Sequence, residues 1–214
     1  MIKLLEELKK EYDKLQIKYG EKDLNSIYFG GCTNNPDYCF VFMNPTKRNI
    51  ASEKKWEGPR SPWIGTKQIW DLFYELNLLD ENIYKEIKRI KSRDWTEVFS
   101  ETVYKNVEDH KCFITNLAKC TQIDARVLPD NIFKKYLDLF LKEIDIIKPK
   151  IIFLFGNQVS TIVLNEKISV SKVRKKEFMI NNKYKCYCLY YPVGNGRFNI
   201  DKTIEDIKYI IGKN

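Results

Sequence analysis

Apolar residues recur along the chain at two distinct spacings, which predict alternating helices and strands. Near the N-terminus, large apolar residues follow one another three or four positions apart: Leu5, Leu8, Tyr12, Leu15 and Tyr19. This spacing, with Gly20 next, predicts an amphipathic helix at about residues 1–20. Short continuous apolar runs, of which residues 151–155 are the clearest, are typical of strands buried on both faces.

The same patterns extend over the rest of the chain. Further apolar runs predict short strands at residues 27–29, 39–43 and 112–115, and a hairpin over 177–190 that turns at Asn181-Asn182. Helical periodicity predicts helices at 66–79 (with Thr66 as N-cap), 80–91, 94–107, 129–147, from 157 onward and at 200–211. Helices that alternate with apolar strands predict an α/β layered fold with a parallel central sheet.

Length and composition favour one soluble domain. The 214 residues suffice for a single core, so we expect one domain over residues 1–214. No run of 18 apolar residues occurs, and the N-terminal helix carries charged residues, unlike a signal peptide. We therefore expect an intracellular, cytoplasmic protein that does not contact a membrane.

The charge of +8 favours a polyanionic partner such as nucleic acid, although a lysine-rich solvated surface has the same balance. Two local groups of basic residues strengthen the first interpretation. One group is Lys47, Arg48, Lys54, Lys55 and Arg60, and the other is Lys172, Arg174, Lys175 and Lys176.

Cysteine and histidine usage narrows the possible chemistry. The six cysteines include no Cys-x-x-Cys pair, so buried free thiols are the simplest interpretation. The single histidine, His110, argues against a histidine-based metal site and against a Ser-His-Asp triad.

Four separate segments combine a strand-like run or a proline with polar or aromatic residues. They are Phe42-Met43-Asn44-Pro45-Thr46, Pro62-Trp63-Ile64-Gly65, Thr115-Asn116-Leu117-Ala118-Lys119-Cys120 and Tyr190-Tyr191-Pro192-Val193-Gly194-Asn195-Gly196-Arg197. In the first segment, the chain must turn sharply out of the predicted strand at Asn44-Pro45. An asparagine at the carboxyl end of a strand lies where open α/β sheets bind ligands.

These segments, in this order, resemble the uracil-DNA glycosylase superfamily over roughly residues 38–211. The most specific part runs from Asn-Leu-Ala-Lys-Cys to Lys-Pro-Lys-Ile-Ile-Phe-Leu-Phe-Gly-Asn-Gln-Val and is similar to the archaeal and thermophilic branches. The resemblance implies a three-layer α/β fold in which helices flank a central four-stranded parallel sheet. It also implies a monofunctional glycosylase of base-excision repair, which flips a damaged base such as uracil out of DNA and hydrolyses its N-glycosidic bond.

The resemblance assigns roles to single residues. Asn44 would position the attacking water, and Tyr191, where the family usually has histidine, would assist departure of the base. Trp63 would stack on the flipped base and Asn116 would read its edge, with Met43 beside them in the base pocket. Each role has a structural alternative: a turn residue at a strand end for the asparagines, and a core aromatic for Trp63.

The resemblance also implies contacts to DNA phosphates by exposed residues. These contacts would come from Lys47, Arg48, Gly194, Asn195, Gly196 and Arg197. Glycines would let backbone N–H groups approach the phosphates closely, although a plain glycine-rich turn is the alternative.

Three departures from the family pattern concern the chemistry. Phe42 replaces the usual leading glycine of the first motif, and Tyr191 lacks the positive charge that histidine can carry. The iron–sulfur branches have four cysteines, of which only Cys120 has a counterpart here, since the expected position of its downstream partner is near Tyr136. We therefore expect no 4Fe-4S cluster and no other metal or cofactor.

Two classes of function remain open. The first is a monomeric DNA glycosylase for uracil, or for another altered base such as hypoxanthine, xanthine or a mismatched thymine. The second is a catalytically weak or inactive DNA-binding protein on the same fold. A hydrolase of free nucleosides is disfavoured because such a substrate would not account for the net positive charge of the protein.

Overall fold

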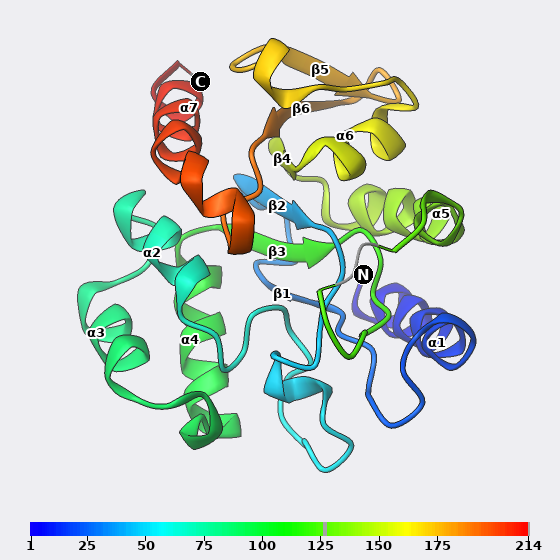
Figure 1. Cartoon of the computed structure of the whole chain (residues 1–214), viewed down its shortest axis with the longest axis vertical. Coiled ribbons are helices and arrows are strands. Elements are labelled where there is room, and N and C mark those ends of the chain that lie inside the picture. Colours follow the sequence, from blue (N-terminus) through cyan, green and yellow to red (C-terminus); the bar gives the residue numbers. More distant parts are fainter. Residues whose placement is uncertain (126–127, 214) are drawn as a thin grey trace.

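The computed structural model describes residues 1–125 and 128–213, and its strands form one mixed sheet between two groups of helices (Figure 1). The strands are β1 (Phe29–Gly31), β2 (Tyr38–Phe42), β3 (Cys112–Asn116), β4 (Ile151–Phe155), β5 (Glu177–Ile180) and β6 (Tyr184–Leu189). The α-helices are α1 (Ile2–Tyr19), α2 (Gln68–Glu75), α3 (Glu81–Arg89), α4 (Glu97–Asp109), α5 (Asp130–Ile147), α6 (Asn157–Leu164) and α7 (Ile200–Lys213). Short 3-10 turns lie at Ile50–Ser52, Ser92–Asp94, Val170–Lys172 and Gly194–Asn199.

The sheet order is β1-β3-β2-β4-β6-β5, and the four central strands run parallel. The edge strands β1 and β5 each pair antiparallel with their neighbour. The predicted α/β layered fold is therefore confirmed, but the expected four-stranded parallel sheet is too small: the described residues form six strands. The difference arises at the edges, where β1 and the hairpin strand β5 extend the parallel centre.

Helices cover both faces of the sheet. Helices α2, α3, α4 and α7 pack on one face, and α1, α5 and α6 pack on the other (Figure 1). Along β2, Phe40 and Phe42 point to the first group, whereas Cys39 and Val41 point to the second. Because neither face meets water, every second position is as apolar as its neighbour, which explains the continuous apolar runs.

Most predicted elements are present, with bounds that differ by a few residues: the sequence predicts β1 at 27–29, α2 at 66–79 and α4 at 94–107. Helix α2 begins at Gln68, and Thr66 is not its N-cap. The Thr66 hydroxyl instead donates to the Trp63 carbonyl at 2.7 Å. The hairpin turns at Asn181 and Asn182, whose φ values of 51° and 52° fit a type I′ turn.

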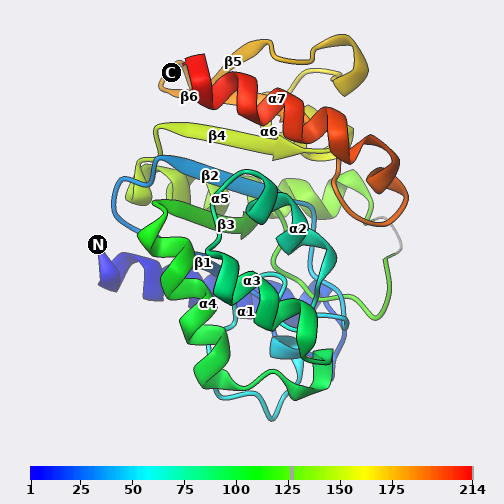
Figure 2. The same cartoon turned by 90° about the vertical axis from the view of Figure 1, so that its left-hand side faces the viewer.

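The parallel strands all end on the same side of the molecule, where β3 and β4 point in Figure 2. The loops that follow these ends carry the polar segments singled out above. Within the described residues, no helix is both long enough and apolar enough to cross a membrane.

A buried ion pair holds the loop after β3. The Lys119 ammonium and the Glu143 carboxylate, both fully buried, lie 3.2 Å apart. Lys119 also donates to Thr115 Oγ1 at 2.6 Å and to the Asn116 carbonyl, while Glu143 accepts from Tyr12 at 2.8 Å. Burial lowers the pKa of Lys119, and the Glu143 charge opposes that shift. The network therefore joins β3, α1 and α5 beneath the loop.

Breaking this pair should destabilise the protein strongly. In Lys119→Met the Glu143 carboxylate stays buried without its cation, so we expect the free energy of unfolding to fall by about 3–5 kcal/mol. Urea denaturation measures the change. Lys111→Met, at an exposed lysine directly before β3, is the control and should change stability by less than about 0.5 kcal/mol. Equal stability of the two variants would contradict the role assigned to the pair.

Candidate functional site

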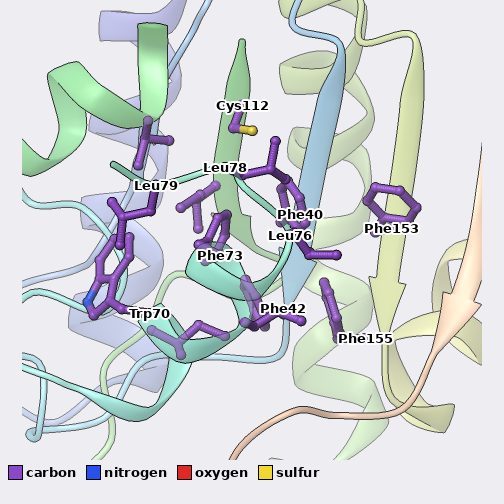
Figure 3. Close-up of a cluster of buried hydrophobic side chains, with 14 of the residues drawn as sticks. Phe40, Phe42, Trp70, Phe73, Leu76, Leu78, Leu79, Cys112, Phe153 and Phe155 are labelled. Atoms are coloured by element: carbon purple, nitrogen blue, oxygen red, sulfur yellow. The ribbon is translucent and has the colours of Figure 1, made fainter. Parts of the chain in front are cut away.

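The candidate site lies at the carboxyl ends of the central strands, where side chains form a row across the sheet. Phe42 pairs in register with Asn116 of β3, and Phe155 pairs with Leu189 of β6. The Phe42 and Phe155 rings stack at 4.5 Å, with 9° between their planes (Figure 3). Phe42, Phe155 and Leu189 point to the face covered by α2, α4 and α7. An apolar row with one asparagine at its end therefore underlies the site.

The turn that carries Asn44 is fastened to the loop after β3. The amides of Leu117 and Ala118 donate to the carbonyls of Phe42 and Met43, at 2.7 and 3.0 Å. Further along, the amide of Gln122 donates to the Pro45 carbonyl at 3.1 Å, and that of Lys47 donates to the Gln122 carbonyl at 2.8 Å. Two neighbouring strand ends therefore act as one unit.

Asn44 is half-buried within this unit. Its side-chain nitrogen donates to the Pro45 carbonyl at 3.1 Å, which fixes the plane of the amide. The described residues provide no hydrogen bond to its Oδ1. An amide held in this way has one acceptor oxygen available to a ligand or a water molecule.

The long connection between β2 and α2 is ordered by the buried residue Asn49. Its side chain donates to the Ser61 carbonyl at 2.8 Å and accepts from the Ala51 amide at 3.0 Å. The Ile50 amide donates to the Ile64 carbonyl at 3.1 Å. These bonds bring the segment that contains Trp63 back over the end of β2.

Trp63 has a φ of 69°, in the left-handed region that a bulky residue rarely adopts. Its carbonyl accepts from both the amide and the hydroxyl of Thr66, at 3.1 and 2.7 Å. The indole meets the Phe42 ring edge to face, with centroids 5.0 Å apart. The indole N–H is buried and has no partner in the described residues.

Asn116 is 2 % exposed, and its side-chain nitrogen also has no hydrogen-bond partner in the described part of the chain. Its own carbonyl is held by Lys119. The Asn116 backbone is therefore fixed, while its side-chain nitrogen can still donate a hydrogen bond.

Tyr191 completes the group from the opposite side. Its ring meets Phe42 edge to face at 6.2 Å. A Cβ on Gly156 would come within 3.8 Å of the Tyr191 ring, and one on Gly196 would lie only 1.9 Å from the Tyr191 carbonyl oxygen. Burial raises the pKa of Tyr191, so its hydroxyl stays neutral and protonated. It is therefore a hydrogen-bond donor without charge.

Trp63 and Tyr191 contact the Phe42 ring, Asn116 is the register partner of Phe42 on β3, and Asn44 follows Phe42 two positions later. The roles expected for these residues stay predictions. Met43 is different, because its half-buried side chain packs against the other core cluster, with α1 and α5. Its carbonyl accepts from the Ala118 amide in the loop after β3.

The glycine-rich segment forms a 3-10 turn, Gly194–Asn199, beside Tyr191. Gly194, Asn195 and Arg197 are exposed, and an Arg197 nitrogen lies 3.8 Å from the Asp71 carboxylate of α2. Sequence reasoning missed Phe198, whose side chain is 93 % exposed at the end of this turn. The available signal was an aromatic residue directly after a run of glycine and polar residues.

The two basic groups differ in their surroundings. Lys47 and Arg48 are exposed next to Asn44, and the described residues provide no ion partner for either. In the second group, Arg174 donates to both carboxylate oxygens of Asp206, at 2.9 and 2.8 Å, and Lys175 pairs with Glu205. Arg174 and Lys175 therefore fasten a loop to α7, whereas Lys47 and Arg48 present their charge beside the candidate site. In the first group, Lys55 and Arg60 are paired with Glu53 and Asp13.

No group of three or more histidine, cysteine, aspartate or glutamate side chains within residues 1–125 and 128–213 could hold a metal ion. All six cysteines are free and buried, including Cys120. The expectation that the protein uses no cofactor stays a prediction.

Comparison with known proteins identifies one family. The family model described as the Uracil DNA glycosylase superfamily matches residues 29–208, from the start of β1 into α7. A comparison with curated proteins finds none that matches this chain.

Gly196→Ala should disturb the backbone of Tyr191. The added methyl would meet the Tyr191 carbonyl oxygen, so we expect the free energy of unfolding to fall by about 1–3 kcal/mol. Gly212→Ala near the end of α7 is the control, because its added methyl meets nothing within 4 Å apart from its chain neighbours and the backbone of its own helix. Urea denaturation of both variants measures the difference, and an unchanged Gly196→Ala protein would contradict the tight packing of this turn.

Proposed function

The chain belongs to the uracil DNA glycosylase superfamily, and we propose that it is a monofunctional DNA glycosylase that hydrolyses the N-glycosidic bond of uracil, or of another deaminated base, in DNA. The observation that carries the proposal is the arrangement at the carboxyl edge of the sheet, where Trp63 and Tyr191 contact the Phe42 ring, Asn116 is its register partner and Asn44 lies on the turn that follows. These residues come from four segments that are far apart in the sequence.

The reaction requires the damaged nucleotide to leave the base stack, because its glycosidic carbon is not accessible inside a duplex. Phe198 and Arg197 stand on the exposed turn beside Tyr191, which suits insertion of an apolar wedge next to a phosphate contact. Lys47, Arg48 and the backbone of Gly194 and Gly196 supply further contacts to phosphates.

In the site, the flipped base stacks on the Trp63 indole and its edge meets the Asn116 amide. A side-chain amide has one donor and one acceptor, which matches the N3–H and O4 of uracil. The unpartnered nitrogen of Asn116 supports this assignment, since a buried donor without a partner is costly unless a ligand provides one. Met43 contributes through its backbone at the rim.

Hydrolysis forms a bond from a water oxygen to C1′ while the C1′–N bond breaks and its electron pair leaves with the base. The water loses one proton to solvent and the base anion gains one from solvent, so the products are the neutral base and an abasic sugar. Asn44 orients the water through its Oδ1, because the Pro45 carbonyl occupies its nitrogen. Tyr191 donates a hydrogen bond to the departing anion and keeps its proton. No step requires a metal or another cofactor, and we propose none.

A second candidate function is DNA binding with weak or no catalysis on the same fold. Two observations favour it. Tyr191 is neutral where a charged donor would stabilise the leaving group more strongly, and the donor nitrogens of Asn116 and Trp63 are closed off from solvent.

A cleavage panel tests the proposal. Single- and double-stranded oligonucleotides with one uracil, hypoxanthine, xanthine or mismatched thymine are incubated with the protein and then treated with alkali, which breaks the strand at abasic sites. Breaks at one of these bases establish a glycosylase and name its substrate. Salt-sensitive binding without breaks, even at high protein concentration, favours the second candidate.

Asn44→Ala should slow excision at least about a hundredfold, because the water loses its orientation. Binding of the same oligonucleotide, measured by fluorescence anisotropy, should be unchanged. Asn131→Ala, at an exposed asparagine on α5, is the matched control and should excise at the rate of the unmodified protein. If Asn44→Ala excises at the unmodified rate as well, Asn44 does not position the water.

The double variant Lys47→Ala/Arg48→Ala should weaken the salt dependence of DNA binding. Each lost phosphate contact lowers the slope of log K against log salt concentration by about 0.9, so we expect a change of about 1.8. Lys3→Ala/Lys111→Ala removes the same charge near the N-terminus and before β3, at the opposite ends of the strands (Figure 2), and should leave the slope unchanged. Equal slopes for both double variants would place the DNA elsewhere.

A further inference from the structure

Phe42 occupies the centre of the candidate site. It is the last residue of β2 and is fully buried. Its ring stacks on Phe155 at 4.5 Å and meets the rings of Trp63 and Tyr191 almost at right angles, at 5.0 and 6.2 Å (Figure 3 draws Phe42 and Phe155). Phe155, Trp63 and Tyr191 therefore all contact this one phenyl ring. In the proposed function, Trp63 and Tyr191 line the base site and Phe155 lies behind it.

The remaining side of Phe42 faces β3. Its register partner there is Asn116, and paired residues of neighbouring parallel strands point to the same face of the sheet. The Asn116 nitrogen is buried and unpartnered, and the same is true of the Trp63 indole N–H. The two residues next to Phe42 thus each carry a buried donor that has no hydrogen-bond partner in the described residues.

Phe40 provides the internal comparison. It lies two positions earlier on β2, points to the same face and is equally buried. Its ring partners are Phe73, Phe153 and Phe155, which are all fully buried core residues. Phe42, by contrast, has two partly buried partners, Trp63 and Tyr191, and so separates the core from the site.

We propose that Phe42 is a gate in the base pocket, and that its ring fills the place of a single-ring base between Trp63, Tyr191 and Asn116. A base reaches the Asn116 amide only when this ring turns aside. The inference rests on the proposed function, because that function identifies the three surrounding residues as the base site.

The shape of the ring defines which base the opened pocket takes. A phenyl ring and a pyrimidine are both planar six-membered rings, so the space that Phe42 vacates fits uracil. A purine such as hypoxanthine has a second fused ring, for which removal of the phenyl group provides no room. The pocket therefore selects pyrimidines, and Asn116 selects those with a donor and an acceptor on one edge.

The test compares Phe42→Ala with Phe40→Ala, which removes the same ring from the same strand and face. Thermal unfolding is recorded with and without free uracil or free hypoxanthine. Excision from a uracil oligonucleotide is measured in parallel. Phe42→Leu is the second variant, because its smaller change keeps the experiment interpretable if Phe42→Ala does not fold.

We expect free uracil to raise the melting temperature of Phe42→Ala by about 3 °C or more, while Phe40→Ala and the unmodified protein do not respond. Hypoxanthine should have no effect on any of them. Uracil excision by Phe42→Ala should be at least about tenfold faster than that of the unmodified protein, because opening the gate no longer precedes binding. Phe42→Leu should change in the same direction by a smaller factor.

The outcomes separate this inference from the proposed function. If the unmodified protein excises no base but Phe42→Ala binds uracil, the gate is supported and the unmodified protein is the DNA-binding alternative. If the unmodified protein excises uracil and neither Phe42 variant binds uracil or excises it faster, the gate is wrong while the glycosylase stands. A response of Phe40→Ala equal to that of Phe42→Ala also overturns the gate, because any core cavity would then bind the base.

Discussion

The site depends on two opposite charges in the interior, the Lys119 ammonium and the Glu143 carboxylate. Burying such a pair costs free energy of hydration, and its attraction offsets that cost only with good geometry and further hydrogen bonds. Here Thr115 and Tyr12 provide those bonds, and Lys119 also holds the carbonyl of Asn116. The loop that leaves Asn116 is in turn hydrogen-bonded to the turn that carries Asn44. One buried pair therefore sets the geometry of two strand ends.

Above this polar support, the site consists mainly of aromatic rings in strained or tightly packed positions. Trp63 has a left-handed φ, a conformation that costs about 1–3 kcal/mol for such a residue and persists only when its surroundings impose it. Asn49 and Thr66 impose it, through bonds to the same loop and to the Trp63 carbonyl. Strain of this kind, with two unpartnered donors nearby, is typical of a ligand site more than of a core optimised for stability.

The layers of this fold could be predicted from the sequence because each element carries its own periodic signal, from the helix that ends at Gly20 to the apolar run of β4. The choice of Asn44, Trp63, Asn116 and Tyr191 followed from a resemblance of motifs, whereas the contacts of Trp63 and Tyr191 with Phe42 required the structure. Thr66 was misassigned as an N-cap because its hydroxyl bonds backwards to Trp63, a choice that depends on the strained turn. The sequence identified Phe42 only as the residue that replaces the leading glycine of the first motif, since no pattern in the sequence reveals which rings it contacts.

Two of the three departures from the family pattern, at Tyr191 and Phe42, have linked consequences for the proposed catalysis. In the proposed reaction, a neutral hydroxyl at Tyr191 offers the departing anion a hydrogen bond worth about 1.5–3 kcal/mol, which corresponds to roughly ten- to a hundredfold in rate. The cations beside the site, Lys47 and Arg48, are exposed, so salt and water screen their charge. The proposed reaction must therefore gain most of its remaining rate enhancement from a site that excludes water, in which each hydrogen bond to the anion is stronger. Phe42 helps to keep the site dry by the same packing that obstructs the base, so access and dryness oppose each other at a single side chain.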